Sequence, residues 1–300
     1  MTPVDLSGRT AIVTGAGKGL GRAYALHLAA CGASVLVNNR RHPGEEDGAT
    51  SAAQTVAAIE ARGGRAVANW GDVCDPDSGR AMVEQARAAF GGVHIVVANA
   101  GISRAGSFLK QGIAEFRDVF DTGFFGNLHL AHAAWPQLMA QGYGRVVLTA
   151  SSAGLYADHG LSAYSASKAA VIGLARALAL EGRRKNVLAN VIAPYGLSQM
   201  TAAHMSAPMA QAFDPALVAP LVSWLSSAAC DVSGEVLVSG GGMLRRNGTG
   251  ESEGVLLSPG DIGEAVHALR EAPLHAYAAA NQSFASFVRE LEQLQKVSIA

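Results

Sequence analysis

The chain has 300 residues, 49% of them apolar and 16% charged, and its formal net charge at pH 7 is −1. This length and composition fit one large α/β domain with a well-buried core. The near-neutral charge excludes the basic surface of a nucleic-acid-binding protein, so no nucleic-acid partner is expected.

The three cysteines are scattered and lack the spacing of a metal site, so we expect no metal and a reducing, cytoplasmic location. The start of the chain, 1–8, lacks the apolar stretch of a signal peptide. The most apolar helical stretch, 169–180, is too short to span a bilayer. We therefore expect no membrane partner.

Short runs rich in β-branched residues alternate with helical patterns along the chain. Strands that are apolar throughout and are joined by helices indicate a parallel sheet buried on both faces. We therefore predict a doubly wound, Rossmann-type α/β fold of about seven strands, in which ligands bind beyond the carboxyl ends of the strands. The predicted strands are 11–14, 34–38, 66–69, 95–99, 144–150, 187–192 and 235–239.

A glycine-rich segment, TGAGKGLG at 14–21, follows the first predicted strand and precedes an apolar-periodic helix. Gly15, Gly19 and Gly21 let the backbone approach a pyrophosphate, and the helix N-terminus offers free N–H groups and the positive end of its dipole. The segment predicts dinucleotide binding, although such a loop alone is a weak signal.

Three polar residues near mid-chain have a spacing that suits proton transfer. Tyr164 and Lys168 stand four residues apart, so one helix presents both on the same face, and Ser151 lies thirteen residues before the tyrosine. A phenol beside a fixed cation ionises more easily, which suits it to exchange a proton with an alcohol.

These motifs, with Asp72, Asn99-Ala100-Gly101 and Pro194 in the same order, resemble the short-chain dehydrogenase/reductase family. Stretches such as 21–26 and 219–225 are similar to the (3R)-hydroxyacyl-CoA dehydrogenase unit of the type 2 multifunctional enzyme of β-oxidation. The likeness covers about residues 5–250.

The resemblance implies a role for each catalytic candidate. Tyr164 is the acid/base, Lys168 lowers the pKa of that tyrosine and holds the nicotinamide ribose, and Ser151 orients the substrate oxygen. It also implies a set of cofactor-binding residues. These are Gly15, Lys18, Gly19, Leu20, Gly21, Asn39, Arg40, Asp72, Val73, Asn99, Ala100, Gly101, Tyr164, Lys168 and Pro194, with Asp72 and Val73 beside the adenine.

The end of the second strand bears on the choice of cofactor. NAD-dependent relatives carry an acid there that binds the ribose 2′-hydroxyl, whereas this chain has Asn39, which repels no 2′-phosphate. Arg40 follows directly and Lys18 lies in the glycine loop, so either cation can bind that phosphate. We expect NADP(H) to be favoured over NAD(H), unless both residues are solvated loop cations.

A few positions depart from the family pattern or stay open. Relatives usually carry an Asn whose backbone carbonyl positions a water beside the lysine, and here Gly123 occupies that position. His159 faces the substrate or is a solvated loop residue, Tyr195 borders the nicotinamide or substrate, and Thr201 resembles a threonine that contacts the carboxamide. The segment 198–215 has the composition of a mobile lid.

Two regions are expected along the chain. Residues 1–250 form the dinucleotide-binding domain, and 251–300 form a C-terminal helical extension packed on the same domain, with helical periodicity at 259–270 and 281–295. The apolar stripe of the last helix docks on the core, or else forms a pocket wall or subunit arm.

We therefore expect an oxidoreductase that interconverts a sizeable, partly apolar ketone and its secondary alcohol with NADP(H). The alternatives are an NAD-dependent (3R)-hydroxyacyl-CoA dehydrogenase, a non-catalytic nucleotide-binding regulatory protein, and a lyase or epimerase that uses bound cofactor. The apolar helices at 115–140 and 162–180 predict a homodimer or homotetramer.

Overall fold

A computed structural model describes residues 4–41, 44–198, 202, 205–256 and 262–295. The chain divides into two compact units, Met1–Arg246 and Asn247–Ala300. The predicted boundary at residue 250 lies close to this division. The packing of the extension on the first unit stays a prediction.

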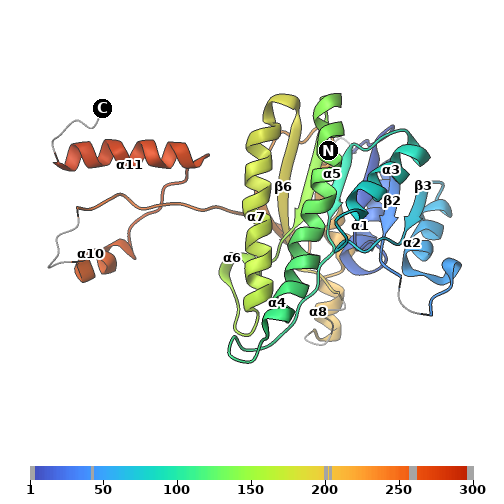
Figure 1. Ribbon diagram of the computed structural model, residues 1–300, viewed down its shortest axis with the longest axis horizontal. Helices are drawn as coiled ribbons and strands as arrows, with labels where there is room; N and C mark the ends of the chain where they lie inside the picture. Colours follow the sequence, from blue (N-terminus) through green and yellow to red (C-terminus); the bar gives the residue numbers. More distant parts are fainter. Residues whose placement is uncertain (1–3, 42–43, 199–201, 203–204, 257–261, 296–300) are drawn as a thin grey trace. The chain divides into compact units, whose positions relative to one another are not determined.

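One eight-stranded sheet forms the centre of the fold, in the order β3-β2-β1-β4-β5-β6-β7-β8 (Figure 1). All neighbouring pairs from β3 to β7 are parallel. The predicted doubly wound α/β fold is thereby confirmed. The strands are β1 Thr10–Val13, β2 Ser34–Asn38, β3 Arg65–Asn69, β4 Ile95–Ala98, β5 Gly144–Thr149, β6 Val187–Pro194, β7 Val236–Gly240 and β8 Met243–Asn247.

β8 is a strand that the sequence did not predict. It follows β7 after Gly241 and Gly242, which have φ of +57° and +75°, and so short a connection requires an antiparallel pair. Its side chains are mostly exposed. Arg246 donates to the Glu235 carboxylate at 2.6 and 3.1 Å. Charged side chains of this kind protect an edge strand from pairing with other chains.

Helices cover both faces of the sheet, and alternate strand residues enter two separate cores. Ala11 and Val13 of β1 pack with α1, α2 and α9, whereas Ile12 packs with α3, α5 and α7. Figure 1 shows α3, α5 and α7 together over one face. These helices are α1 Gly19–Ala30, α2 Ser51–Glu60, α3 Ser78–Phe90, α5 Gly126–Gln141, α7 Ser162–Gly182 and α9 Ala219–Leu225.

The helix predicted at 115–140 is interrupted. α4 Ile113–Phe120 leads into a π-helical turn, Asp121–Phe125, before α5 begins at Gly126. Gly123 and Gly126 have low helix propensity, which makes an irregular turn less costly here. The shorter elements are η1 Asp47–Ala49, α6 Ser152–Tyr156, η3 Arg183–Lys185, α8 Ala207–Ala212 and η5 Pro215–Leu217.

The second unit contains α10 Ile262–Leu269 and α11 Ala280–Gln295, and neither helix has a buried residue. Ser283 Oγ donates to the Glu251 carboxylate at 2.7 and 2.9 Å, which ties α11 to the start of the unit. Phe284 and Phe287 are exposed, so the docking of this apolar stripe stays a prediction. Across the described ranges, no helix combines the length and apolar character needed to cross a bilayer.

Candidate active site

A cleft with a volume of about 790 Å³ opens where the strand order reverses between β1 and β4. Parallel sheets bind ligands at this point, beyond the carboxyl ends of the strands. All the residues named from the sequence as catalytic or cofactor-binding candidates line it. They are Gly15, Lys18, Gly19, Leu20, Gly21, Asn39, Arg40, Asp72, Val73, Asn99, Ala100, Gly101, Ser151, Tyr164, Lys168 and Pro194.

Hydrogen bonds fix the glycine loop to the end of the neighbouring strand, and the loop has no room for a larger side chain at Gly21. Gly15 and Gly19 have φ of +61° and +52°, and a Cβ at Gly21 would collide with the Gly15 carbonyl oxygen. Asn99 Nδ2 donates to the Thr14 carbonyl oxygen at 3.0 Å, and Thr14 Oγ1 accepts from Asn99 N at 3.0 Å and from Ala100 N at 3.1 Å. Because α1 begins at Gly19, within this glycine-rich segment, the residues fit the pyrophosphate of a dinucleotide.

Ser151, Tyr164 and Lys168 meet at the other end of the cleft. Ser151 is the N-cap of α6, where its Oγ accepts from Ala153 N at 3.2 Å. α7 carries the tyrosine and the lysine. Lys168 is 2% exposed, its Nζ donates to the Thr149 carbonyl oxygen at 2.8 Å, and it lies 5.8 Å from the centre of the Tyr164 ring. A hydroxyl, a phenol and an ammonium therefore share one site.

Burial shifts the pKa of both titratable groups of this set. It raises the pKa of Tyr164, and a hydrogen bond with Ser151 acts in the opposite direction. Burial lowers the pKa of Lys168 from 10.5 to about 8. The predicted lowering of the tyrosine pKa was wrong in direction, because the sequence shows the neighbouring lysine but not the burial of the phenol. The raised pKa keeps the Tyr164 phenol protonated at neutral pH, so the group holds a proton that it can donate.

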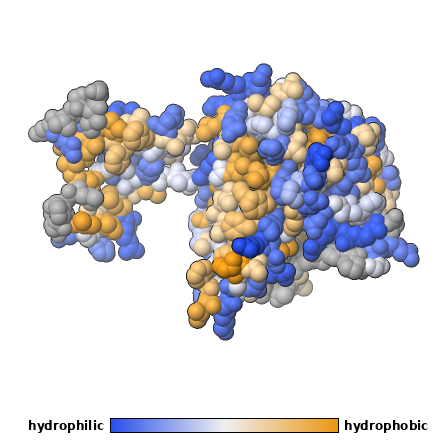
Figure 2. Space-filling view, viewed as in Figure 1, coloured by the Kyte–Doolittle hydropathy of each residue, from blue (hydrophilic) through white to orange (hydrophobic). Residues whose placement is uncertain are grey.

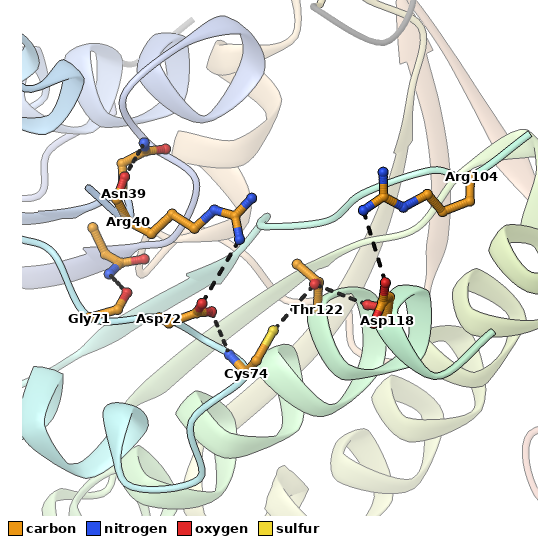
Figure 3. Close-up of polar contacts among 9 residues, drawn as sticks. Asn39, Arg40, Gly71, Asp72, Cys74, Arg104, Asp118 and Thr122 are labelled. Carbon is orange, nitrogen blue, oxygen red and sulfur yellow. Dashed lines mark hydrogen bonds and ion pairs between the residues drawn. The ribbon is translucent and has the colours of Figure 1, made fainter. Parts of the chain in front are cut away.

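Polar contacts order the part of the cleft that contains Asp72, where the adenine was expected, as Figure 3 shows. Asp72 Oδ1 accepts from Cys74 N at 3.0 Å, and Arg40 Nη1 lies 3.9 Å from Asp72 Oδ2. Asn38, which the sequence analysis missed, is buried and donates from Nδ2 to the Gly71 carbonyl oxygen at 2.9 Å. A polar residue at the end of an apolar strand is the signal that could have identified it.

The π-helical turn places Gly123 against α7. The Gly123 carbonyl oxygen accepts from Asn127 Nδ2 at 2.7 Å, and a Cβ at Gly123 would lie 2.6 Å from Ser167 Oγ. Ser167 Oγ and Asn127 Oδ1 are buried, and within the described ranges neither has a hydrogen-bond partner. Gly123 therefore leaves the space that the Ser167 hydroxyl fills, and its carbonyl can still accept a second hydrogen bond.

We expect Gly123→Asn to change turnover by less than ~10-fold, equivalent to about 1.4 kcal/mol. The backbone carbonyl remains, and the Ser167 hydroxyl can rotate away from the new Cβ. Gly126→Asn is the matched control, because its Cβ would lie 2.7 Å from Val73 Cγ2 and would displace a residue that lines the cleft. Steady-state kinetics of both variants checks this, and a large gain from Gly123→Asn would show that the glycine impairs the site.

Two loops lie where the substrate was expected to bind. Gly106 N donates to the Gly160 carbonyl oxygen at 2.9 Å, which joins the loop after β4 to the loop after α6. His159 is exposed and is not among the described residues that line the cleft. Tyr195 does line it, whereas Thr201 and part of the predicted lid at 198–215 lie outside the described residues. Cleft-lining residues that the sequence analysis missed include Ile102, Ser103, Tyr156, Asp158 and Leu161.

Ala157 has an unusual backbone conformation at the mouth of the cleft. Its φ of +60° and ψ of +175° fall in a region that glycine alone adopts freely. Holding another residue there costs about 1–3 kcal/mol. Because Ala157 lines the cleft between Tyr156 and Asp158, its strained backbone sets the direction of both neighbours.

Ala157→Gly should therefore stabilise the protein by about 1 kcal/mol, since relief of strain exceeds the extra entropy of an unfolded glycine. Ala166→Gly, on the exposed side of α7, is the matched control and should cost about 0.5–1 kcal/mol. Urea denaturation of both variants gives the two free energies of unfolding. Equal destabilisation by both would contradict strain at Ala157.

Comparison with known proteins shows which sequences this chain resembles. Residues 9–210 match the family model described as short chain dehydrogenase. A short-chain type dehydrogenase/reductase of Mycobacterium tuberculosis is 41% identical over 240 residues, which cover 79% of this chain and 84% of the relative. The peroxisomal multifunctional enzyme type 2 of Mus musculus is 38% identical over 245 residues, which cover 81% of this chain and 33% of the mouse enzyme.

A solved structure has the same fold over nearly the whole chain. The full-length peroxisomal multifunctional enzyme type 2 from Drosophila melanogaster superposes with a TM-score of 0.77 at 31% identity, covering 98% of this chain and 51% of that chain. The resemblance to this multifunctional enzyme is thereby confirmed. The chain spans about a third of the mouse enzyme and half of the fly chain.

Proposed function

Because this chain belongs to the short chain dehydrogenase family, and so is an NAD(P)-dependent oxidoreductase, we propose that it transfers a hydride between NADP(H) and a ketone or secondary alcohol. One observation carries this proposal. A single cleft contains the glycine loop, the buried Lys168, Tyr164 and Ser151. A nucleotide-binding regulatory protein would need only the first of these.

Each residue of the set has a distinct part in the reduction of a ketone. A bound nicotinamide would supply the hydride to the carbonyl carbon. Ser151 donates a hydrogen bond to the carbonyl oxygen and orients it, and Tyr164 transfers its phenolic proton to that oxygen as the alcohol forms. Lys168, charged below about pH 8, stabilises the phenolate that remains. Oxidation of an alcohol runs through the same steps in reverse.

The substrate end supports a sizeable, partly apolar substrate. Ile102, Tyr156, Leu161 and Tyr195 line this part of the cleft. Asp158 also lines it and gives the mouth an acceptor for a hydroxyl or amine of the substrate. Apolar walls with few polar groups are typical of sites that bind apolar small molecules.

Arg40 and Lys18 support a preference for NADP(H). The pair between Arg40 and Asp72 is long, and the two side chains are 58% and 48% exposed. Such surface pairs contribute about 0–1 kcal/mol, so the guanidinium is available to turn toward a 2′-phosphate. Asn39 lines the cleft beside it and carries no charge that would repel that phosphate.

The double change Asn39→Asp/Arg40→Ala should shift the preference toward NAD(H). Loss of one hydrogen bond to a charged group, about 1.5–3 kcal/mol, weakens NADP(H) binding by about 10- to 100-fold, and the new carboxylate repels the phosphate but accepts from a free 2′-hydroxyl. Calorimetric titration of both cofactors against wild type and variant measures the two shifts. Equal binding of NADH and NADPH by wild type would contradict the proposed preference.

The second candidate is an NAD-dependent (3R)-hydroxyacyl-CoA dehydrogenase. The likeness to the peroxisomal multifunctional enzyme type 2 of the mouse favours it. A screen of NADPH and NADH oxidation over ketones, steroids, diketones and 3-ketoacyl-CoA thioesters separates the two candidates. Turnover of the thioesters with NADH but not with NADPH would favour the second candidate. If none of the screened ketones were reduced, the result would count against both candidates.

The predicted assembly and location stay predictions. Figure 2 shows a band of apolar surface over α7, which fits a two-fold contact between subunits. Sedimentation at several concentrations measures the oligomeric state. The exposed residues of that helix face are Ala166, Ala169, Gly173, Ala177 and Leu180.

A further inference from the structure

The carboxamide of Asn39 lies where three segments of the chain meet, namely the end of β2, the glycine loop and the start of α2. Its Nδ2 donates to Ser51 Oγ at 3.0 Å and to the Arg40 carbonyl oxygen at 3.2 Å. Ser51 is the first residue of α2 and is 4% exposed. A Cβ at Gly17 would collide with Ser51 Oγ and would lie 2.9 Å from Asn39 Cγ. The glycine loop therefore closes against this pair of side chains.

The start of α2 is fixed independently of Asn39. Thr50 is the N-cap of the helix, and its Oγ1 accepts from Ala53 N at 3.2 Å. The same oxygen accepts from Trp70 Nε1 at 3.0 Å, which ties the helix to the segment after β3. Ser51 therefore presents its hydroxyl to Asn39 from a rigid position, although it does not itself line the cleft among the described residues.

We propose that Ser51 is a positioning residue that sets nucleotide selectivity through Asn39, an inference that rests on the proposed function. A hydroxyl can accept and donate a hydrogen bond. While Nδ2 of Asn39 donates to Ser51, the amide oxygen is the end left to accept from a ribose 2′-hydroxyl. When the amide is turned over, Ser51 donates to Oδ1, and Nδ2 faces a 2′-phosphate.

The two orientations depend on Ser51 to different degrees. In the observed orientation Asn39 also donates to the Arg40 carbonyl oxygen, so one contact remains if the serine hydroxyl is removed. Turning the amide over breaks this hydrogen bond, because Oδ1 of Asn39 would then face the Arg40 carbonyl oxygen. Ser51 is the donor that holds the turned amide, and its removal should therefore weaken binding of a 2′-phosphate more than binding of a free ribose.

The test uses two fragments that differ only at the 2′ position. Adenosine 2′,5′-bisphosphate and 5′-AMP are titrated calorimetrically against wild type and Ser51→Ala. One neutral hydrogen bond is worth about 0.5–1.5 kcal/mol, so the bisphosphate should bind about 2- to 10-fold more weakly, whereas the affinity for 5′-AMP should change by less than ~2-fold. Ser51→Thr keeps the hydroxyl and should keep the wild-type selectivity.

Two controls distinguish positioning from a general structural effect. Ser78→Ala removes another buried serine at the first position of a helix, α3, and should leave the selectivity ratio unchanged. In an Asn39→Ala background, Ser51→Ala should no longer alter the ratio, because coupled residues give non-additive effects. The inference would be overturned if Ser51→Ala weakened the binding of both fragments equally. It would also be overturned if Ser51→Ala changed the selectivity ratio by the same factor in the Asn39→Ala background as in wild type. Failure of wild type to bind either fragment would overturn the proposed function with it.

Discussion

Tyr164→Phe should fold, bind the cofactor and lose at least ~10²-fold in turnover, since a general acid/base group contributes that much or more. Only the hydroxyl is removed, so the ring still fills its place beside Ser151 and Lys168. Phenylalanine has no proton to transfer to the carbonyl oxygen. The measurement is steady-state turnover with the best substrate of the ketone screen, together with calorimetric titration of the cofactor.

Tyr195→Phe is the matched control for that experiment. Tyr195 also lines the cleft and is 44% exposed, but it lies outside the proposed proton path. We expect its turnover to stay within ~10-fold of wild type, a change below about 1.4 kcal/mol. Near-wild-type turnover of Tyr164→Phe, or an equal loss in both variants, would contradict the role proposed for Tyr164.

Lys168→Met should stabilise the ligand-free protein at pH 7 by about 2 kcal/mol while turnover falls. The pKa of Lys168 is lowered from 10.5 to about 8, so its charged form costs about 3 kcal/mol in the folded state. Methionine fills a similar volume without a charge. It loses the hydrogen bond to the Thr149 carbonyl oxygen, worth about 1 kcal/mol, which leaves the smaller net gain.

The sign follows from the direction of the shift. A lysine pKa that is lower in the folded state means that the unfolded chain binds the proton more tightly, so the penalty is fully present below pH 8. It declines as the pH rises from about 8 and is gone above 10.5. The advantage of Lys168→Met in urea denaturation should therefore shrink over that range.

Lys185→Met is the control for this effect. Lys185 is exposed on η3, and surface substitutions change stability by about 0.5 kcal/mol or less. A destabilised Lys168→Met at pH 7, or an advantage independent of pH, would show that the buried ammonium is not strained. A stabilised but inactive variant would show that the site keeps a costly charge for its function.

The parallel core could be predicted from the sequence because both of its faces are covered. All residues of β4 and β5 are buried, and strands of this kind are almost continuous apolar runs. The candidate site could be predicted for a related reason. The glycine loop, Asn99 and Ser151 closely follow strand ends, and the strand ends of one parallel sheet converge. Tyr164 and Lys168 lie on α7, and their four-residue spacing places them on one face of that helix.

Irregular local structure could not be predicted. The π-helical turn at Asp121–Phe125 lies within an apolar-periodic stretch, and the periodicity does not show one unusual turn. β8 has exposed, charged side chains rather than an apolar run. The positive φ of Ala157 could not be expected from the sequence, because residues other than glycine rarely adopt a positive φ.

The burial of individual charged or polar groups also could not be predicted from the sequence. Arg145 was expected only as part of a strand, yet it is 2% exposed. Its guanidinium donates to the carbonyl oxygens of Gly144, Asn186 and Ser227, at 2.9 Å each. The pKa direction of Tyr164 was missed for the same reason. Tertiary contacts decide the burial of such groups, and local spacing does not reveal them.

Transfer of a labelled hydride tests the central claim most directly. NADPH that carries deuterium at both C4 positions of the dihydronicotinamide is mixed with wild type and the best ketone, and mass spectrometry locates the deuterium in the product. We expect the label on the carbinol carbon with wild type, with about one label for each NADPH oxidised, and its appearance should slow in Tyr164→Phe in step with turnover. A product that forms without label while NADPH stays unchanged would contradict an oxidoreductase and indicate a lyase or epimerase.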